Sequence, residues 1–148
     1  MTSPPTQTLQ EPGEPAEPRT LALRVMTMPK DTNQYGTIFG GVILSYIDQA
    51  GFAEARRHGA HRWVTVAIDK VEFKEPVMLG DVVSLYGRTT RKGRTSVTVE
   101  IEVEAERYSS GAIIAVTSAR LTMVSVDSTG SPIPFTSPPT VREVTPAR

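Results

Sequence analysis

The stretch from residue 42 to residue 58, VILSYIDQAGFAEARRH, decides the fold of this 148-residue chain. It contains no proline, and its apolar residues recur at intervals of three and four positions, which predicts a helix. These residues cover most of the helix circumference, so we expect other parts of the protein to surround it. Gly59 follows directly and is predicted to end the helix.

Strands are predicted on both sides of this helix, over residues 21–26 before it and over residues 63–73, 81–91, 94–106 and 113–126 after it. Residues 94–106 alternate most regularly. One face of that strand carries Val97, Val99, Ile101, Val103 and Ala105, and the other carries Thr98, Glu100, Glu102, Glu104 and Glu106. We therefore expect one packed face and one wet face. Since a single helix must cover all the strands, the sequence predicts an α+β fold, an antiparallel five-stranded curved sheet wrapped around one long central helix.

The prolines mark the limits of the folded unit. Five of them lie in residues 1–19 and five lie after residue 131, whereas only Pro29 and Pro76 fall between. Residues 1–19 also carry three glutamates and few apolar side chains, a composition that cannot bury enough surface to offset the entropy of ordering. We predict a disordered Pro/Glu-rich tail over 1–19, one folded domain over 20–135 and a flexible C-terminal tail over 136–148.

Composition excludes several classes of function. Sixteen basic residues balance sixteen acidic ones, so the chain lacks the positive field that nucleic-acid binding usually needs. It has no cysteine, which excludes disulfides, thiolate metal sites and a cysteine nucleophile. No apolar run approaches the roughly 18 residues of a membrane span, and the first residues lack the basic-then-apolar order that is typical of a signal peptide. We expect neither nucleic acid nor a membrane as a partner, and we predict a cytoplasmic location.

Asp48 is the anomaly of the predicted helix. The residues three and four positions away are Leu44, Ser45, Gly51 and Phe52, so no Lys or Arg shares its face. Desolvating a carboxylate costs several kcal/mol unless partners compensate. Asp48 therefore bonds a buried backbone group, faces solvent or serves as a catalytic carboxylate, and the residues alone leave these alternatives open.

Other polar positions also have two interpretations. Gly40 and Gly41 either let a ligand approach the free amides of the helix start or meet the positive φ of a tight turn. Asn33 either orients a water or a carbonyl or caps a turn. The basic stretch from residue 91 to residue 96 is either a phosphate-binding turn or a solvated one.

The combination of these positions is more specific than any one of them. The sequence reads DTNxxGxxFGG over residues 31–41, followed by DxxG over residues 48–51. It resembles the hotdog-fold acyl-CoA thioesterases, and more narrowly the short bacterial acyl-CoA hydrolases and their eukaryotic cytosolic relatives. Further matches are VTV at 64–66, VEFxxP at 71–76, GDVV at 80–83 and KGRTS at 92–96. The likeness covers about residues 20–135.

This resemblance implies hydrolysis of acyl-CoA thioesters to a carboxylic acid and coenzyme A, without a metal or other cofactor. It implies that Asp48 acts as general base or nucleophile, that Asn33 is an active-site asparagine, and that the amide of Gly41 stabilises the oxyanion. Substrate contacts are expected from Phe39, Gly40, Thr65, Phe73, Lys74, Lys92, Gly93, Arg94, Thr95 and Ser96. The sequence alone does not indicate the acyl length.

The spacing along the helix adds an inference about assembly. Seven residues separate Gly41 from Asp48, about 10 Å at the rise of an α-helix. One thioester carbon cannot sit at both, so Asp48 must come from a second protomer and the site needs a homodimer. The resemblance implies the same shared site, with dimers gathered into a tetramer or hexamer.

Two other functions compete with hydrolysis. A hotdog acyl-thioester hydratase or dehydratase needs a catalytic histidine, but His58 and His61 lie where histidines more often cap a helix or face solvent. A non-catalytic acyl-CoA sensor needs an output module, and the tails carry no helix-turn-helix pattern. The complete set of Asn33, Gly41 and Asp48 also favours an enzyme.

Overall fold

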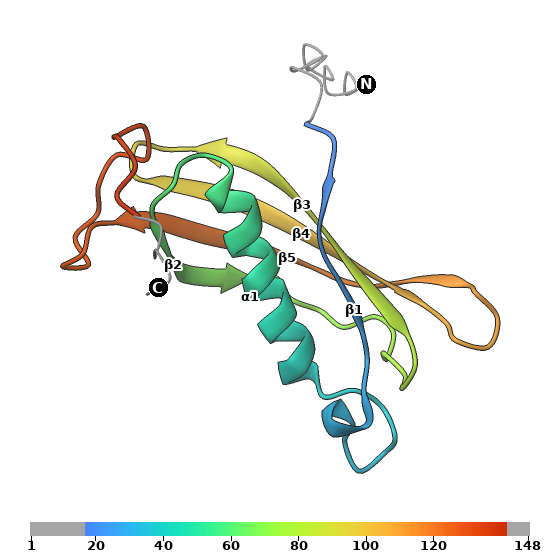
Figure 1. Cartoon of the computed structure of the whole chain (residues 1–148). Helices are drawn as coiled ribbons and strands as arrows, with labels where there is room; N and C mark the ends of the chain where they lie inside the picture. Colours follow the sequence, from blue (N-terminus) through green and yellow to red (C-terminus); the bar gives the residue numbers. More distant parts are fainter. Residues whose placement is uncertain (1–16, 142–148) are drawn as a thin grey trace, which may run out of the picture.

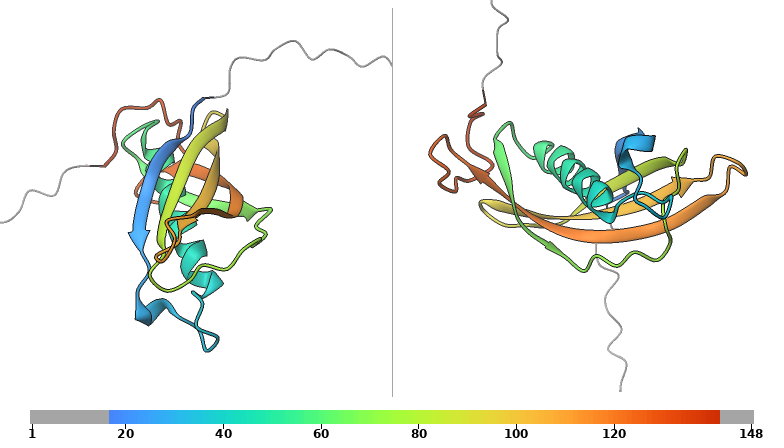
Figure 2. Two further views of the ribbon diagram at one scale, coloured as in Figure 1. Left: turned by 90° about the vertical axis from the view of Figure 1, so that its right-hand side faces the viewer. Right: turned by 90° about the horizontal axis from the view of Figure 1, so that it is seen from below.

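A computed structural model describes residues 17–141 of the chain. Its elements, in chain order, are β1 (Thr20–Met26), the short 3₁₀-helix η1 (Pro29–Asp31), α1 (Gly40–Arg56), β2 (Arg62–Asp69), β3 (Val82–Lys92), β4 (Ser96–Glu106) and β5 (Ile113–Val126). The five strands form one antiparallel sheet in the order β1-β3-β4-β5-β2. The sheet curves around α1, which lies in its concave face (Figures 1 and 2). The predicted hotdog fold is confirmed.

The alternation of β4 produces the predicted division into a packed and an outer face. Its inward side chains are at most 1% exposed: Val97, Val99, Ile101, Val103 and Ala105. On the outer face, Arg19 donates to Glu102 and Glu104 at 2.8 and 2.9 Å, and Arg88 donates to Glu100 at 3.3 Å. Because these ion pairs are partly exposed, they contribute little stability, and the buried aliphatic row holds the sheet against the helix.

The helix begins earlier and ends earlier than the sequence predicted. Gly40 and Gly41 form its first turn, because the carbonyl oxygen of Phe39 accepts the amides of Val42 and Ile43. Residues 57 and 58 continue only as a turn, so the predicted bounds of 42–58 were wrong by two residues at each end.

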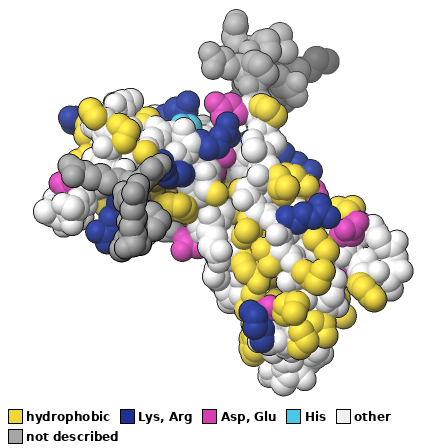
Figure 3. Space-filling model, viewed as in Figure 1, with side chains coloured by type: hydrophobic (Ala, Val, Ile, Leu, Met, Phe, Trp, Pro, Cys, Tyr) yellow, Lys and Arg dark blue, Asp and Glu magenta, His cyan; other side chains and the backbone are white. Residues whose placement is uncertain are grey.

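The sheet surrounds only one side of α1. Ile43, Ile47 and Ala50 face it and are at most 1% exposed, whereas Leu44 and Phe52 on the opposite side are 36% and 44% exposed. Figure 3 shows hydrophobic side chains over α1 and β1 on the face turned to the viewer. The expectation that protein surrounds the helix is therefore met on one side only within a single chain.

Two predicted strand boundaries were wrong. β2 ends at Asp69 and not at residue 73, because Lys70 adopts a φ of 57° and turns the chain out of the sheet. The next residues pass the start of the helix as an irregular segment, held where the amide of Lys74 donates to the Val116 carbonyl at 2.9 Å. Arg94 and Thr95 lie in the turn between β3 and β4, because the amide of Gly93 donates to the Ser96 carbonyl at 2.7 Å and closes that turn.

The chain folds back after β5. The amides of Thr140 and Val141 donate to the carbonyl oxygen of Ala60, so residues 136–141 of the predicted C-terminal tail contact the loop after α1. The division into two tails and one domain stays a prediction, and residues 1–16 and 142–148 lie outside the described residues. Within residues 17–141, no helix is long and apolar enough to cross a membrane.

Candidate active site

The start of α1 presents backbone amides that the chain itself does not use. Among residues 17–141, the amides of Gly40 and Gly41 have no acceptor. Neither glycine has a positive φ, so the tight-turn interpretation was wrong. A Cβ atom at Gly41 would meet nothing within 4 Å, and one at Gly40 would lie 3.6 Å from the Phe73 ring. Neither the backbone conformation nor packing within the chain requires glycine at position 41. The visible effect of the missing side chain is that the backbone amide stays open to a ligand.

Asp48 lies on the exposed side of α1 and is tied to β2. Its Oδ1 accepts a hydrogen bond of 2.5 Å from the Thr65 hydroxyl, whose oxygen also lies 3.2 Å from the sulfur of Met123. Within the described residues, Oδ2 of Asp48 has no partner. The carboxylate is therefore neither buried against the backbone nor freely rotating, but oriented with one oxygen available. Sequence reasoning assigned Thr65 to substrate contact and missed this bond.

Asp48 and Thr65 line a groove of about 680 Å³ over the exposed side of the helix, which we call the helix groove. Its floor is the middle of α1, and its walls come from β1 and β2, the two edge strands of the sheet. Apart from Asp48, Gln49 and Thr65 the lining is apolar: Ala22, Leu23, Phe52, Ala53, Trp63, Val64 and Met123. Apart from Thr65, the sequence pointed to none of the wall residues as part of the site, because the curvature of the sheet brings them together.

A second hollow lies at the start of the helix. This N-terminal pocket, of about 270 Å³, is lined by Ile38, Gly40, Ile43, Phe73, Lys74, Glu75, Pro76 and Val77. It brings together three of the predicted site residues, Gly40, Phe73 and Lys74. It contains neither Asp48 nor Thr65, so a single chain separates the amides from the carboxylate.

Asn33 caps a turn within the chain. Its Oδ1 accepts the amides of Tyr35 and Thr37 at 2.9 and 3.1 Å, and its Nδ2 donates to the Thr37 hydroxyl at 2.8 Å. The capping interpretation is therefore confirmed for the single chain. One N–H of the amide remains unused among the described residues, which is compatible with a further role.

The basic turn lies at the other end of the helix. His58, after the last helical residue, contacts Thr89 near the end of β3 at 2.6 Å. The basic turn is therefore separated from Gly40 by about the length of the helix, roughly 25 Å for 17 residues (Figure 1). The turn comprises Lys92, Gly93, Arg94, Thr95 and Ser96. A single chain does not bring this turn to the N-terminal pocket.

The sequence profile described as "Thioesterase superfamily" matches residues 35–111 of this chain. The chain belongs to the thioesterase superfamily. The acyl-CoA thioester hydrolase YciA of Escherichia coli is 41% identical over 115 residues, which cover 76% of this chain and 87% of that protein.

Solved structures share the fold of this thioesterase over about four fifths of its chain. A hexameric hotdog-fold thioesterase of Campylobacter jejuni is 48% identical, with a TM-score of 0.74 over 78% of this chain and 90% of its own. A hexameric thioesterase of Yersinia pestis is 39% identical, with a TM-score of 0.76 over 80% of this chain and 97% of its own.

The two histidines of this thioesterase serve packing. His61 is 1% exposed, and its Nε2 donates to the Phe135 carbonyl at 2.8 Å. His58 donates to Thr89, since the Thr89 hydroxyl itself donates to the buried carboxylate of Glu54 at 3.1 Å. Burial, and the nearby charge of Lys92, hold the pKa of His58 below its ordinary value. Neither histidine lines the helix groove, so neither is placed as the base of a hydratase there.

Metal ligands do not gather in the described part of the chain. Between residues 17 and 141, no three side chains of Asp, Glu or His lie close enough together to hold a metal ion. The expectation of a metal-free reaction stays a prediction.

Proposed function

We propose that this thioesterase hydrolyses acyl-CoA thioesters to a carboxylic acid and free coenzyme A. The observation that carries the proposal is the pairing of an open helix-start amide at Gly41 with an oriented carboxylate at Asp48 beside an apolar groove. An acyl-CoA substrate presents the matching parts, a thioester carbonyl and an apolar chain. The name of the Escherichia coli relative supports the same substrate class.

The active site is shared between two protomers. Gly41 and Asp48 lie about 10 Å apart on one helix, and the groove that Asp48 lines does not include Gly41, so one thioester cannot use both from the same chain. A second copy of α1, packed antiparallel on the exposed side, would cover Leu44 and bring its own Asp48 to this Gly41. The hexameric relatives support a dimer built into a larger assembly of three such dimers.

Hydrolysis in this site needs a base, an oxyanion donor and a leaving group. Asp48 accepts a proton from water through Oδ2 while Thr65 holds Oδ1, and the resulting hydroxide attacks the thioester carbon. The Gly41 amide donates to the oxyanion of the tetrahedral intermediate. Collapse of the intermediate breaks the carbon–sulfur bond, and the coenzyme A thiolate takes up the proton that Asp48 removed from water, which restores the carboxylate. In the alternative route, the carboxylate itself attacks the thioester carbon and expels the coenzyme A thiolate, and water then hydrolyses the mixed anhydride to the carboxylic acid and free Asp48.

The remaining predicted residues are assigned to coenzyme A and the reacting carbonyl. Phe73 and Lys74 line the N-terminal pocket with Gly40, where they would contact the pantetheine arm and the phosphates of coenzyme A. The free N–H of Asn33 orients the carbonyl or the water. The basic turn, residues 92–96, reaches coenzyme A only from a neighbouring subunit, where its charges would pair with phosphate. A reaction without metal or other cofactor and a cytoplasmic location stay predictions.

The test compares Asp48→Asn with Asp69→Asn, a matched change at an exposed carboxylate outside the helix groove. We expect Asp48→Asn to lower kcat for release of coenzyme A thiol at least about a hundredfold, the usual scale for loss of a general base, and Asp69→Asn to leave it unchanged. Light scattering should give the same assembly for all three proteins. Wild-type turnover in Asp48→Asn would overturn the role of Asp48, and binding of acyl-CoA without turnover in the wild type would favour a sensor.

A further inference from the structure

We propose that Trp63 closes one end of the helix groove and sets the longest acyl chain that the enzyme accepts. This inference rests on the proposed hydrolysis and concerns its specificity. Trp63 lies two residues before Thr65 on β2, so both side chains are on the same face of the strand, about 7 Å apart along it. Since Thr65 bonds Asp48, the indole lies one step along the strand from the residue that holds the proposed catalytic carboxylate.

The groove beyond Asp48 suits an alkyl chain that runs towards the end of the helix. There the lining is apolar, with Phe52 and Ala53 from α1, Leu23 from β1 and Trp63 from β2. The N-terminal pocket at the start of the helix is a separate hollow, and its lining includes the charged residues Lys74 and Glu75. An acyl chain that enters the helix groove therefore gains hydrophobic burial as it extends towards Trp63.

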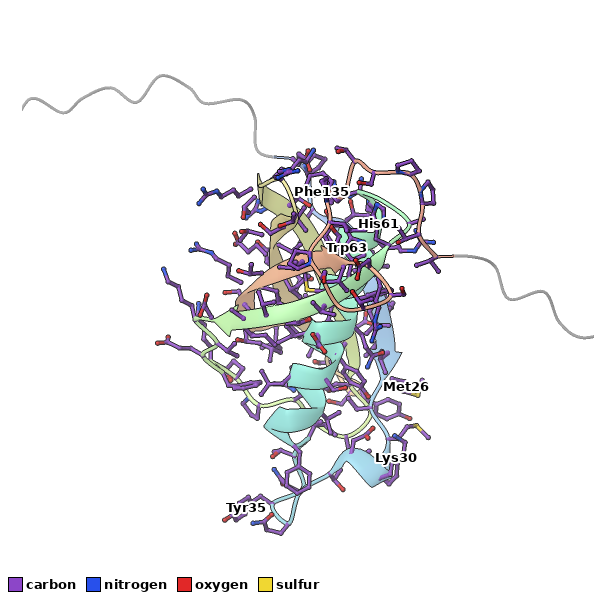
Figure 4. All side chains as sticks on the ribbon, turned by 90° about the vertical axis from the view of Figure 1, so that its left-hand side faces the viewer. Met26, Lys30, Tyr35, His61, Trp63 and Phe135 are labelled. Carbon is purple, nitrogen blue, oxygen red and sulfur yellow. The ribbon has the colours of Figure 1, made fainter. Side chains whose placement is uncertain are left out.

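Trp63 is held too firmly to swing aside. Its side chain is buried, and the indole N–H donates to the Gly59 carbonyl at 3.0 Å. Its ring packs against those of His61 and Phe135, with centroids 6.4 and 6.0 Å away. Figure 4 shows these three residues together at the end of the molecule opposite Tyr35.

The segment after β5 holds the neighbours of Trp63 in place. Ring nitrogens of His61 contact both the Phe135 carbonyl and the Thr140 hydroxyl, at 2.8 and 3.0 Å. The amide of Phe135 also donates to the carbonyl of Arg94 at 3.3 Å. Since packed interiors leave no room for a ring to move without displacing its neighbours, a longer chain meets Trp63 as a stop.

The experiment measures kcat/KM with butanoyl-, hexanoyl-, octanoyl- and decanoyl-CoA. In the wild type we expect kcat/KM to rise with chain length and then fall before decanoyl-CoA. Trp63→Ala should move the maximum of kcat/KM to a longer chain. It should also raise the ratio of kcat/KM for decanoyl-CoA to that for hexanoyl-CoA at least about tenfold, since each methylene newly buried should raise kcat/KM roughly three- to fourfold.

Two further variants test the same inference with less risk of unfolding the protein. Trp63→Phe keeps an aromatic ring in the wall and should shift the ratio in the same direction by a smaller factor. Ala53→Leu fills the groove from the floor at a helix position that tolerates leucine, and should shift the ratio in the opposite direction.

The outcomes separate this inference from the proposed function. If the wild type hydrolyses the four acyl-CoAs and the variants lower kcat/KM equally for all of them, the role of Trp63 as a stop is overturned. The proposed hydrolase function would still stand. A wild type that accepts decanoyl-CoA as well as hexanoyl-CoA would have the same two consequences. A wild type that releases no coenzyme A from any member would instead overturn the hydrolase.

Discussion

Replacing Gly41 by alanine should keep or raise the stability of the protein and lower its activity. The position lies in the first turn of α1, has no positive φ and offers empty space to a Cβ atom. Glycine in a helix costs roughly 0.5 to 1 kcal/mol relative to alanine, so Gly41→Ala should leave the free energy of unfolding unchanged or raise it by up to about 1 kcal/mol.

Activity should fall despite this gain. The added methyl group stands beside the amide to which the thioester oxygen must come within about 3 Å. A displacement of bound substrate by about 1 Å is enough to cost up to a hundredfold in rate, so we expect kcat/KM to fall between about tenfold and a hundredfold.

The assay is release of coenzyme A thiol, accompanied by urea unfolding and light scattering. Ser45→Ala is the matched control, since Ser45 lies one turn further on the same exposed side and its hydroxyl bonds only Gln49 within the described residues, at 3.3 Å. It should gain similar stability and keep its activity. Wild-type kcat/KM in Gly41→Ala, with the assembly intact, would refute the role of the amide. A lower free energy of unfolding for Gly41→Ala than for the wild type would refute the conclusion that neither backbone conformation nor packing within the chain requires this glycine.

Two further predictions concern packing and pH. Gly51→Ala should destabilise the protein by about 1 to 3 kcal/mol in urea unfolding, because its Cβ would lie 2.7 Å from Cδ2 of the buried Leu121; an unchanged midpoint would contradict this close packing. The folded state holds the pKa of His58 below its ordinary value, mainly through burial and also through Lys92, so the unfolded chain binds the proton more readily. The stability from His58 is therefore present above about pH 6.5 and is lost as the pH falls below it, and His58→Gln should lose less stability than the wild type between about pH 8 and pH 5. Equal losses in both proteins would refute this assignment.

The sequence by itself determined the elements with strong periodicity. The alternation from Val97 to Ala105 defined both faces of β4, and the three- and four-residue spacing around Ile43 and Ile47 defined the helix. These patterns are local, because each side chain's direction follows from its position along one element. Asp48 was visible for the same reason, since its helical neighbours could be read from the chain.

Boundaries depended on contacts that are distant in sequence. β2 continues as a strand in composition up to residue 73, yet the chain leaves the sheet at Lys70. The first turn of α1 includes two glycines that propensity would exclude, because the Phe39 carbonyl accepts hydrogen bonds there. Local preference is weak compared with such tertiary contacts.

Only the tertiary structure decided which predicted residues meet. It joined Thr65 to Asp48 across 17 positions of sequence, placed Trp63 in the lining of the same groove, and left the basic turn at the far end of the helix. The curvature of the sheet brings its two edge strands to either side of α1, and no local pattern encodes that approach. Sequence identified the groups that could do the chemistry, whereas the distances between them follow from strand order and curvature, which are properties of the whole sheet.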